Sequence, residues 1–163
     1  MKQVSLWATS THIRPALDHS LRRNLVSSAK VVLQSSGLDY DMLVVTGVSG
    51  CIFGASLADA LGMPLCIVRK DEVPASHSGR IVEGPDDDDT PIKWLFVDDL
   101  MSTGATYIRV QQKIKLRYTQ SVHVGVFLYQ DISRWGLDQG KVEVPVFGVQ
   151  GKFNYHPGWA NPM

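Results

Sequence analysis

The sequence has only two cysteines, no net charge and no long apolar run. Cys51 and Cys66 belong to no C-x-x-C pair and no Cys/His spacing, which favours buried reduced thiols over a metal site. Sixteen basic and sixteen acidic residues cancel, so no nucleic-acid or membrane surface is expected. No stretch approaches the ~18 apolar residues of a membrane span, and no apolar signal segment stands at the start. We therefore expect a soluble, cytoplasmic protein.

The 163 residues, 44% of them hydrophobic, suffice for one domain with an apolar core and are too few for two. Leucine or alanine at every fourth position from Leu17 to Leu33 predicts a helix with one apolar face, and Gly37 is placed to end it. Beyond it, short apolar runs predict strands with helices between them. The strands are expected at 42–47, 64–70, 93–97, 122–129 and 142–149, and the helices at 53–61 and 105–117.

Strands that alternate with helices predict an α/β fold, mainly a parallel sheet with helices on both faces. In such sheets ligands bind beyond the carboxyl ends of the strands. Polar or charged segments are expected there at 46–50, at 69–70 and at 98–99. The segment 71–91 has no apolar period and is rich in Pro, Gly, Ser and Asp, which predicts a long loop. Its acidic run at 86–89 is more typical of a solvated loop tip than of a metal site.

Two adjacent carboxylates, Asp98 and Asp99, follow the expected strand at 93–97. Such a pair repels itself and loses hydration unless other groups donate to it. A structural alternative is that one carboxylate caps a helix while the other faces solvent. The next residues are small or carry hydroxyls and open a helix, where backbone N–H groups can hold a phosphate. Together the two features fit a sugar with vicinal hydroxyls and a 5′-phosphate.

The stretch LFVDDLMSTGAT resembles the phosphoribosyl-pyrophosphate-binding motif of type I phosphoribosyltransferases. The chain before it is similar to the family's pyrophosphate loop, in VVTGVSGCIFGASLADALGMPLCIVRK, and to its flexible loop, in RKDEVPASHSGRIVEG. These stretches span 43–106 and are closest to adenine and orotate enzymes. The resemblance implies a single domain over 1–163 with its core at about 41–130. A small "hood" over the nucleobase would come from 1–40, from 131–163, or from both.

The resemblance implies transfer of a phosphoribosyl group from 5-phosphoribosyl-1-pyrophosphate to a nucleobase, with Mg²⁺ as cofactor and a homodimer as the assembly. Asp98 and Asp99 would bind the ribose hydroxyls and, through substrate or water, the metal. Lys70 and His77 would act with them in catalysis. The pyrophosphate would be bound by Thr46, Gly47, Val48, Ser49, Gly50, Arg69 and Lys70, and the 5′-phosphate by Ser102, Thr103, Gly104, Ala105 and Thr106.

Three positions depart from the family's pattern. Ser49 stands where adenine enzymes carry an arginine, and the residues at 71–73 lack the second lysine of the adenine and orotate loop, leaving His77 or Arg80 as stand-ins. Ser102 stands where hypoxanthine-guanine enzymes carry an aspartate, so that specificity is not expected. The first two departures keep an alternative open, a regulatory protein that senses phosphoribosyl pyrophosphate or a nucleotide with little or no turnover.

Overall fold

The computed structural model describes residues 13–70, 79–86, 90–130 and 142–152, and these form one seven-stranded sheet in the order β3-β2-β1-β4-β5-β6-β7. The parallel strands are β1 (Met42–Thr46), β2 (Leu65–Val68), β4 (Lys93–Asp98), β5 (Val122–Leu128) and β6 (Val146–Gly148). The short strands β3 (Val82–Glu83) and β7 (Gly151–Lys152) pair antiparallel at the two edges. The predicted α/β architecture with a mainly parallel sheet is confirmed.

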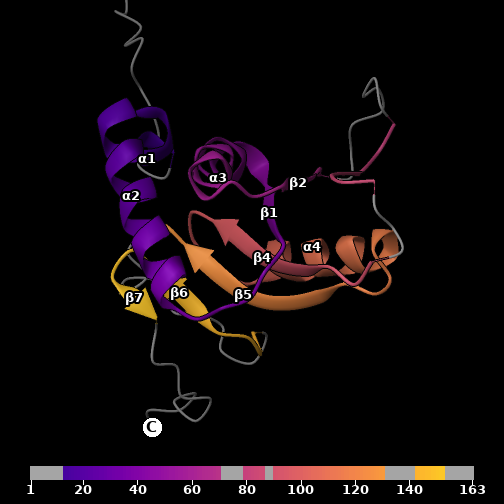
Figure 1. Cartoon of the computed structure of the whole chain (residues 1–163). Helices are drawn as coiled ribbons and strands as arrows, with labels where there is room; N and C mark the ends of the chain where they lie inside the picture. Colours follow the sequence, from indigo (N-terminus) through magenta and orange to yellow (C-terminus); the bar gives the residue numbers. More distant parts are fainter. Residues whose placement is uncertain (1–12, 71–78, 87–89, 131–141, 153–163) are drawn as a thin grey trace, which may run out of the picture.

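Helices cover both faces of this sheet (Figure 1). They are α1 (Arg14–Leu17), α2 (His19–Ser35), α3 (Gly47–Leu61) and α4 (Ala105–Arg117). α2 and α3 lie together on one face and α4 lies on the other. In β1, Leu43 and Val45 pack in the core with α3, whereas Met42 and Val44 pack in the core with α4. All five residues of β1 are buried, as expected for a central strand covered on both sides.

Local signals mark the ends of two helices. Asp18 precedes α2, and its Oδ1 accepts a hydrogen bond of 2.9 Å from the backbone N–H of Leu21, which caps the first turn. Gly62 follows α3 with φ 67°, a left-handed conformation that glycine adopts without strain. The start of α2 and the end of α3 therefore coincide with capping residues that can be recognised in the sequence.

The predicted apolar face of the helix from Leu17 to Leu33 is wrong in its first half. The helix is interrupted at Asp18, so Leu17 ends α1, and Leu17 and Leu21 are 50% and 41% exposed. The buried residues of α2 are Val26, Ala29 and Leu33. Steps of four residues advance about 40° beyond a full turn, so leucines spaced by four drift around the helix instead of keeping to one face. The buried residues Val26, Ala29 and Leu33 are spaced by three and then four residues, which keeps them on one face.

Several predicted boundaries also differ. α3 begins at Gly47, earlier than the expected 53, and so includes most of the segment predicted to bind pyrophosphate. The long loop contains β3, which pairs with β2. The expected strand at 142–149 is reduced to β6, since Pro145 has no N–H to donate to a sheet, and β7 was not predicted.

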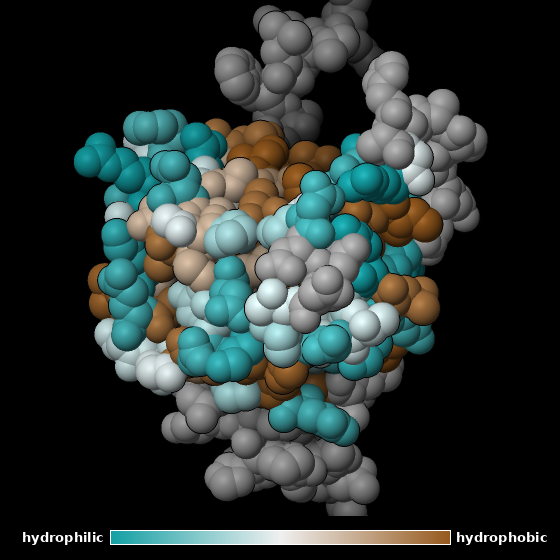
Figure 2. Space-filling view, turned by 45° about the vertical axis from the view of Figure 1, so that its right-hand side comes forward, coloured by the Kyte–Doolittle hydropathy of each residue, from teal (hydrophilic) through white to brown (hydrophobic). Residues whose placement is uncertain are grey.

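The described part of 1–40 packs in the main core rather than apart from it, because α2 lies against α3 and β6. A hood over the nucleobase stays a prediction, because the residues at 1–12, 131–141 and 153–163 that could form it lie outside the described residues. The face in Figure 2 is hydrophilic over much of its area, with hydrophobic residues gathered in its upper part. No helix among the described residues is long and apolar enough to cross a membrane.

Candidate functional site

The carboxyl ends of β1 and β4 lie side by side, because the strands are parallel neighbours with Val45 opposite Val97. Thr46 and Asp98 therefore end adjacent strands. α3 begins directly after Thr46, and the turn that leads into α4 follows Asp98. The fold thus brings two of the predicted segments, 46–50 and 98–106, to the same edge of the sheet.

The two aspartates are held by backbone hydrogen bonds. Asp98 is 9% exposed, and its Oδ1 accepts the N–H of Asp99 at 2.9 Å. Asp99 in turn accepts the N–H of Leu100 at 2.8 Å. Burial, followed by the neighbouring Asp99 carboxylate, raises the pKa of Asp98 to about 8. A carboxyl group that resists ionisation at the end of a strand is typical of a ligand site, because a bound donor or cation would relieve the cost of its charge.

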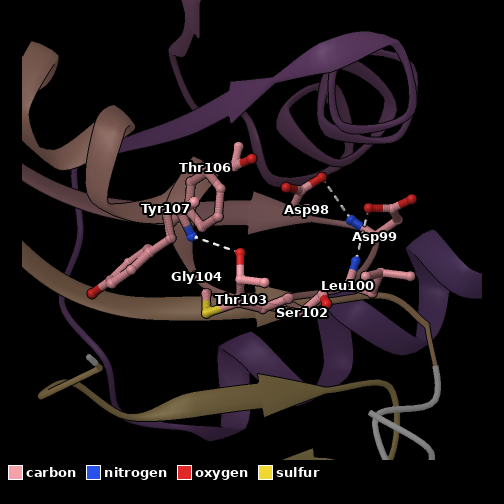
Figure 3. Close-up of a pocket in the computed structure, with 11 residues that line it drawn as sticks. Asp98, Asp99, Leu100, Ser102, Thr103, Gly104, Thr106 and Tyr107 are labelled. Carbon is pink, nitrogen blue, oxygen red and sulfur yellow. Dashed lines mark hydrogen bonds between the residues drawn. The ribbon is translucent and has the colours of Figure 1, made fainter. Parts of the chain in front are cut away.

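The turn after the aspartates lines a pocket of 220 Å³, whose lining consists of Phe96 and residues 98–107 (Figure 3). Gly104 precedes α4 with φ 73° and, as a glycine, has no side chain to cap the helix. Thr103 Oγ1 accepts the N–H of Ala105 at 3.3 Å, which shapes the turn. The start of α4 therefore presents backbone N–H groups and the positive end of the helix dipole to the pocket, the arrangement that binds phosphate.

The start of α3 lies against the acidic pair. A Cβ at Gly50 would be 3.4 Å from Asp98 Oδ1, so a larger residue would crowd the carboxylate. Thr46 does not cap the helix with its side chain, and its hydroxyl donates to the carbonyl oxygen of Val68 at 2.8 Å. Gly54 keeps the helix close to β1, since a Cβ there would be 2.3 Å from Val45 Cγ1. A second uncapped helix start therefore faces the same edge of the sheet.

The side chains of Lys70 and Arg69, which were predicted to meet the pyrophosphate, have different surroundings. Lys70 is exposed, and its charge lowers the pKa of Asp98, opposing the larger effects of burial and of Asp99. Arg69 forms an ion pair of 3.1 Å with Glu83 of β3. Its role toward pyrophosphate stays a prediction, as does that of His77, which lies outside the described residues.

Tyr129 is a residue at this edge that was not predicted from the sequence. This residue directly follows β5 at the same edge of the sheet, and its backbone N–H donates to the carbonyl oxygen of Asp98 at 3.1 Å. Its side chain is 2% exposed and stacks on Phe53 of α3, with ring centroids 4.2 Å apart. The only signal in the sequence was its place at the end of an apolar strand.

Comparison with known proteins gives one curated relative and several solved structures. Orotate phosphoribosyltransferase of Oceanobacillus iheyensis is 26% identical over 122 residues, which are 74% of this chain and 56% of that protein. The structure of orotate phosphoribosyltransferase from Francisella tularensis superposes with a TM-score of 0.65 at 21% identity, covering 82% of this chain and 68% of that one. The adenine phosphoribosyltransferase of Thermoanaerobacter pseudethanolicus gives 0.64 at 19% identity, covering 84% of each chain.

The chain has the type I phosphoribosyltransferase fold. The resemblance to this family is thereby confirmed. No family model matches the chain. The chain spans about half the length of the curated relative it matches, 56%.

Proposed function

We propose that this protein is a phosphoribosyltransferase that joins a nucleobase to the ribose 5-phosphate part of 5-phosphoribosyl-1-pyrophosphate and releases pyrophosphate. One observation carries the proposal: a single pocket has the buried Asp98 with Asp99 on one side and the uncapped start of α4 on the other. The orotate and adenine phosphoribosyltransferases among its relatives support the same activity.

In this proposal the ribose lies between the acidic pair and the turn. Asp98 and Asp99 accept hydrogen bonds from the two ribose hydroxyls, which replace the water that a buried carboxylate lacks. Backbone N–H groups at 102–106, with the hydroxyls of Ser102, Thr103 and Thr106, bind the 5′-phosphate. Gly104 matters because its left-handed backbone opens the helix start toward the pocket.

The pyrophosphate then faces the start of α3 and Lys70. The N–H groups at 46–50 point from an uncapped helix start, and Lys70 supplies a positive charge near the acidic pair. Attack of a base nitrogen on C1 of the ribose breaks the bond to pyrophosphate, whose charge grows as it leaves. The residues therefore act by positioning the substrate and neutralising charge, without a covalent protein intermediate.

The residues fit Mg²⁺ in one specific way. No group of three or more His, Cys, Asp or Glu side chains in the described part of the chain is placed to hold a metal. Mg²⁺ commonly binds through one or two carboxylates, water and substrate phosphates, and Asp98 with Asp99 would supply that share. When bound, the ion would offset the negative charge of the pyrophosphate. We also propose that the second substrate is a nucleobase and that residues beyond the described ones form the hood over it. The assembly in this proposal is a homodimer.

A regulatory protein that binds phosphoribosyl pyrophosphate without turnover is the second candidate. Ser49 contributes no charge to the start of α3, and Arg69 is engaged by Glu83. Both observations leave fewer cations for the departing pyrophosphate than a fast transferase would use. Such a protein would keep the ribose-phosphate site and lose only the rate.

The test is to incubate the protein with Mg²⁺, phosphoribosyl pyrophosphate and a panel of free bases that includes orotate and adenine, and to measure pyrophosphate release. Release that depends on one base supports the transferase. Tight binding of phosphoribosyl pyrophosphate by calorimetry, with no release for any base, supports the regulator. If the protein neither binds the substrate nor releases pyrophosphate, the proposed function is wrong.

A further inference from the structure

The hydroxyl of Tyr129 is the one buried side-chain polar atom in the described residues that has no hydrogen-bond partner. The Ser49 side chain lowers the pKa of Tyr129 as a hydrogen-bond partner would, although the two groups miss the distance and angle of a full hydrogen bond. Native proteins pair the large majority of their buried polar atoms. An unpaired hydroxyl at this edge of the sheet therefore calls for a partner from beyond the described residues, and a bound ligand can supply one.

The hydroxyl lies at the start of α3. The Tyr129 ring stacks on Phe53 in this helix, and its hydroxyl interacts with Ser49 in the first turn. The same hydroxyl interacts with Asp98 and Asp99, and Asp98 lies beside Gly50. The unpaired hydroxyl, the uncapped helix start and the acidic pair thus share one corner of the site.

The chemistry of this corner favours an anion. Burial, with the two aspartates, raises the pKa of Tyr129, so the hydroxyl stays protonated and donates. The uncapped N–H groups of α3 are also donors, and the helix dipole favours negative charge. Ribose hydroxyls have the carboxylates as their natural acceptors, which leaves a diphosphate oxygen as the group that this set of donors fits.

We propose that Tyr129 is a substrate-binding residue, whose hydroxyl donates a hydrogen bond to the pyrophosphate group at the start of α3. The proposal rests on the proposed function, because it adds a donor to the pyrophosphate side of that site. The stacking on Phe53 fixes the ring, so little freedom is lost when the hydrogen bond forms.

The test compares Tyr129→Phe with the unmodified protein by calorimetry, using inorganic pyrophosphate with Mg²⁺ as one probe and ribose 5-phosphate as the other. The variant keeps the ring and its stacking and removes only the hydroxyl. We expect pyrophosphate to bind about tenfold more weakly, equal to about 1.4 kcal/mol. The affinity for ribose 5-phosphate should stay unchanged. Without ligand, the melting temperature should stay equal or rise, because an unpaired buried hydroxyl has been removed.

Tyr118→Phe is the matched control. The Tyr118 hydroxyl is also part of a buried residue, but it donates to the carbonyl oxygen of Pro85 at 2.7 Å. Its loss should lower the melting temperature and leave pyrophosphate binding unchanged. The two variants thus separate a hydroxyl that serves the fold from one that serves a ligand.

Three outcomes would overturn the proposal. Equal pyrophosphate affinity in Tyr129→Phe and the unmodified protein would show that the hydroxyl serves no such ligand. A lower melting temperature with weaker binding of both probes would show a structural role. If the unmodified protein binds ribose 5-phosphate but not pyrophosphate, the role of Tyr129 is wrong while the sugar site stands; if it binds neither, the proposed function fails as well.

Discussion

Replacing Asp98 by Asn should separate ligand binding from stability. The amide keeps an oxygen that can accept the N–H of Asp99, so the local backbone hydrogen bond is retained. It removes the charge that a ribose hydroxyl would meet. Loss of a charge-assisted hydrogen bond costs roughly 1.5–3 kcal/mol, so phosphoribosyl pyrophosphate should bind about 10- to 150-fold more weakly. Asp98→Asn combined with Asp99→Asn should abolish transfer.

Stability should respond in the opposite direction. Burial and the neighbouring Asp99 raise the pKa of Asp98 in the folded state from its ordinary value of 3.8 to about 8, so its contribution to stability is greatest below about pH 4 and is lost as the pH rises toward 8. The asparagine variant does not ionise. Relative to the unmodified protein, it should therefore become more stable as the pH is raised from 4 to 8.

The assay is urea unfolding of both proteins at pH 5 and pH 8, together with calorimetric binding of phosphoribosyl pyrophosphate in Mg²⁺. Asp59→Asn is the control, because Asp59 is an exposed carboxylate in the last turn of α3, the end opposite the site. It should change neither binding nor the pH dependence. Unchanged affinity in the Asp98 and Asp99 double variant would refute the site. A variant that loses stability equally at both pH values would refute the argument from burial.

Two further predictions concern the core. The pKa of His123 is lowered to about 4 by burial, and its ring is held between the Tyr107 hydroxyl at 3.0 Å and the Gly125 carbonyl oxygen at 2.8 Å. The folded state therefore takes up fewer protons than the unfolded one, and stability should fall by up to about 3 kcal/mol as the pH drops from 6.5 to 4. His123→Gln should reduce that dependence in urea unfolding and His19→Gln should not; equal pH profiles for all three proteins would contradict the argument. Gly54→Ala should destabilise by about 1–3 kcal/mol, because its Cβ would meet Val45 Cγ1 at 2.3 Å. Val45→Ala in the same chain should recover part of the loss in a double-mutant cycle, and purely additive effects would count against the contact.

Local sequence signals alone predict the parallel α/β fold and the segments at the carboxyl-end edge of the sheet. Strand runs, helix periods and the small-residue turn after Asp99 are local signals, and the carboxyl ends of parallel strands must meet at one edge. This is why the segments at 46–50 and 98–106 could be assigned before any contact was known.

Which residues those elements bury, and which residues they pair, depends on tertiary packing. Val26, Ala29 and Leu33 became the inner face of α2 because of where the sheet lies, and the spacing of leucines did not reveal it. The ion pair of Arg69 with Glu83 depends on the pairing of β3 with β2. The unpaired hydroxyl of Tyr129 exists because β5 places it under α3, whose residues are far away in the chain. Local sequence sets backbone propensity, whereas burial and partnership depend on long-range packing, which no short stretch of residues contains.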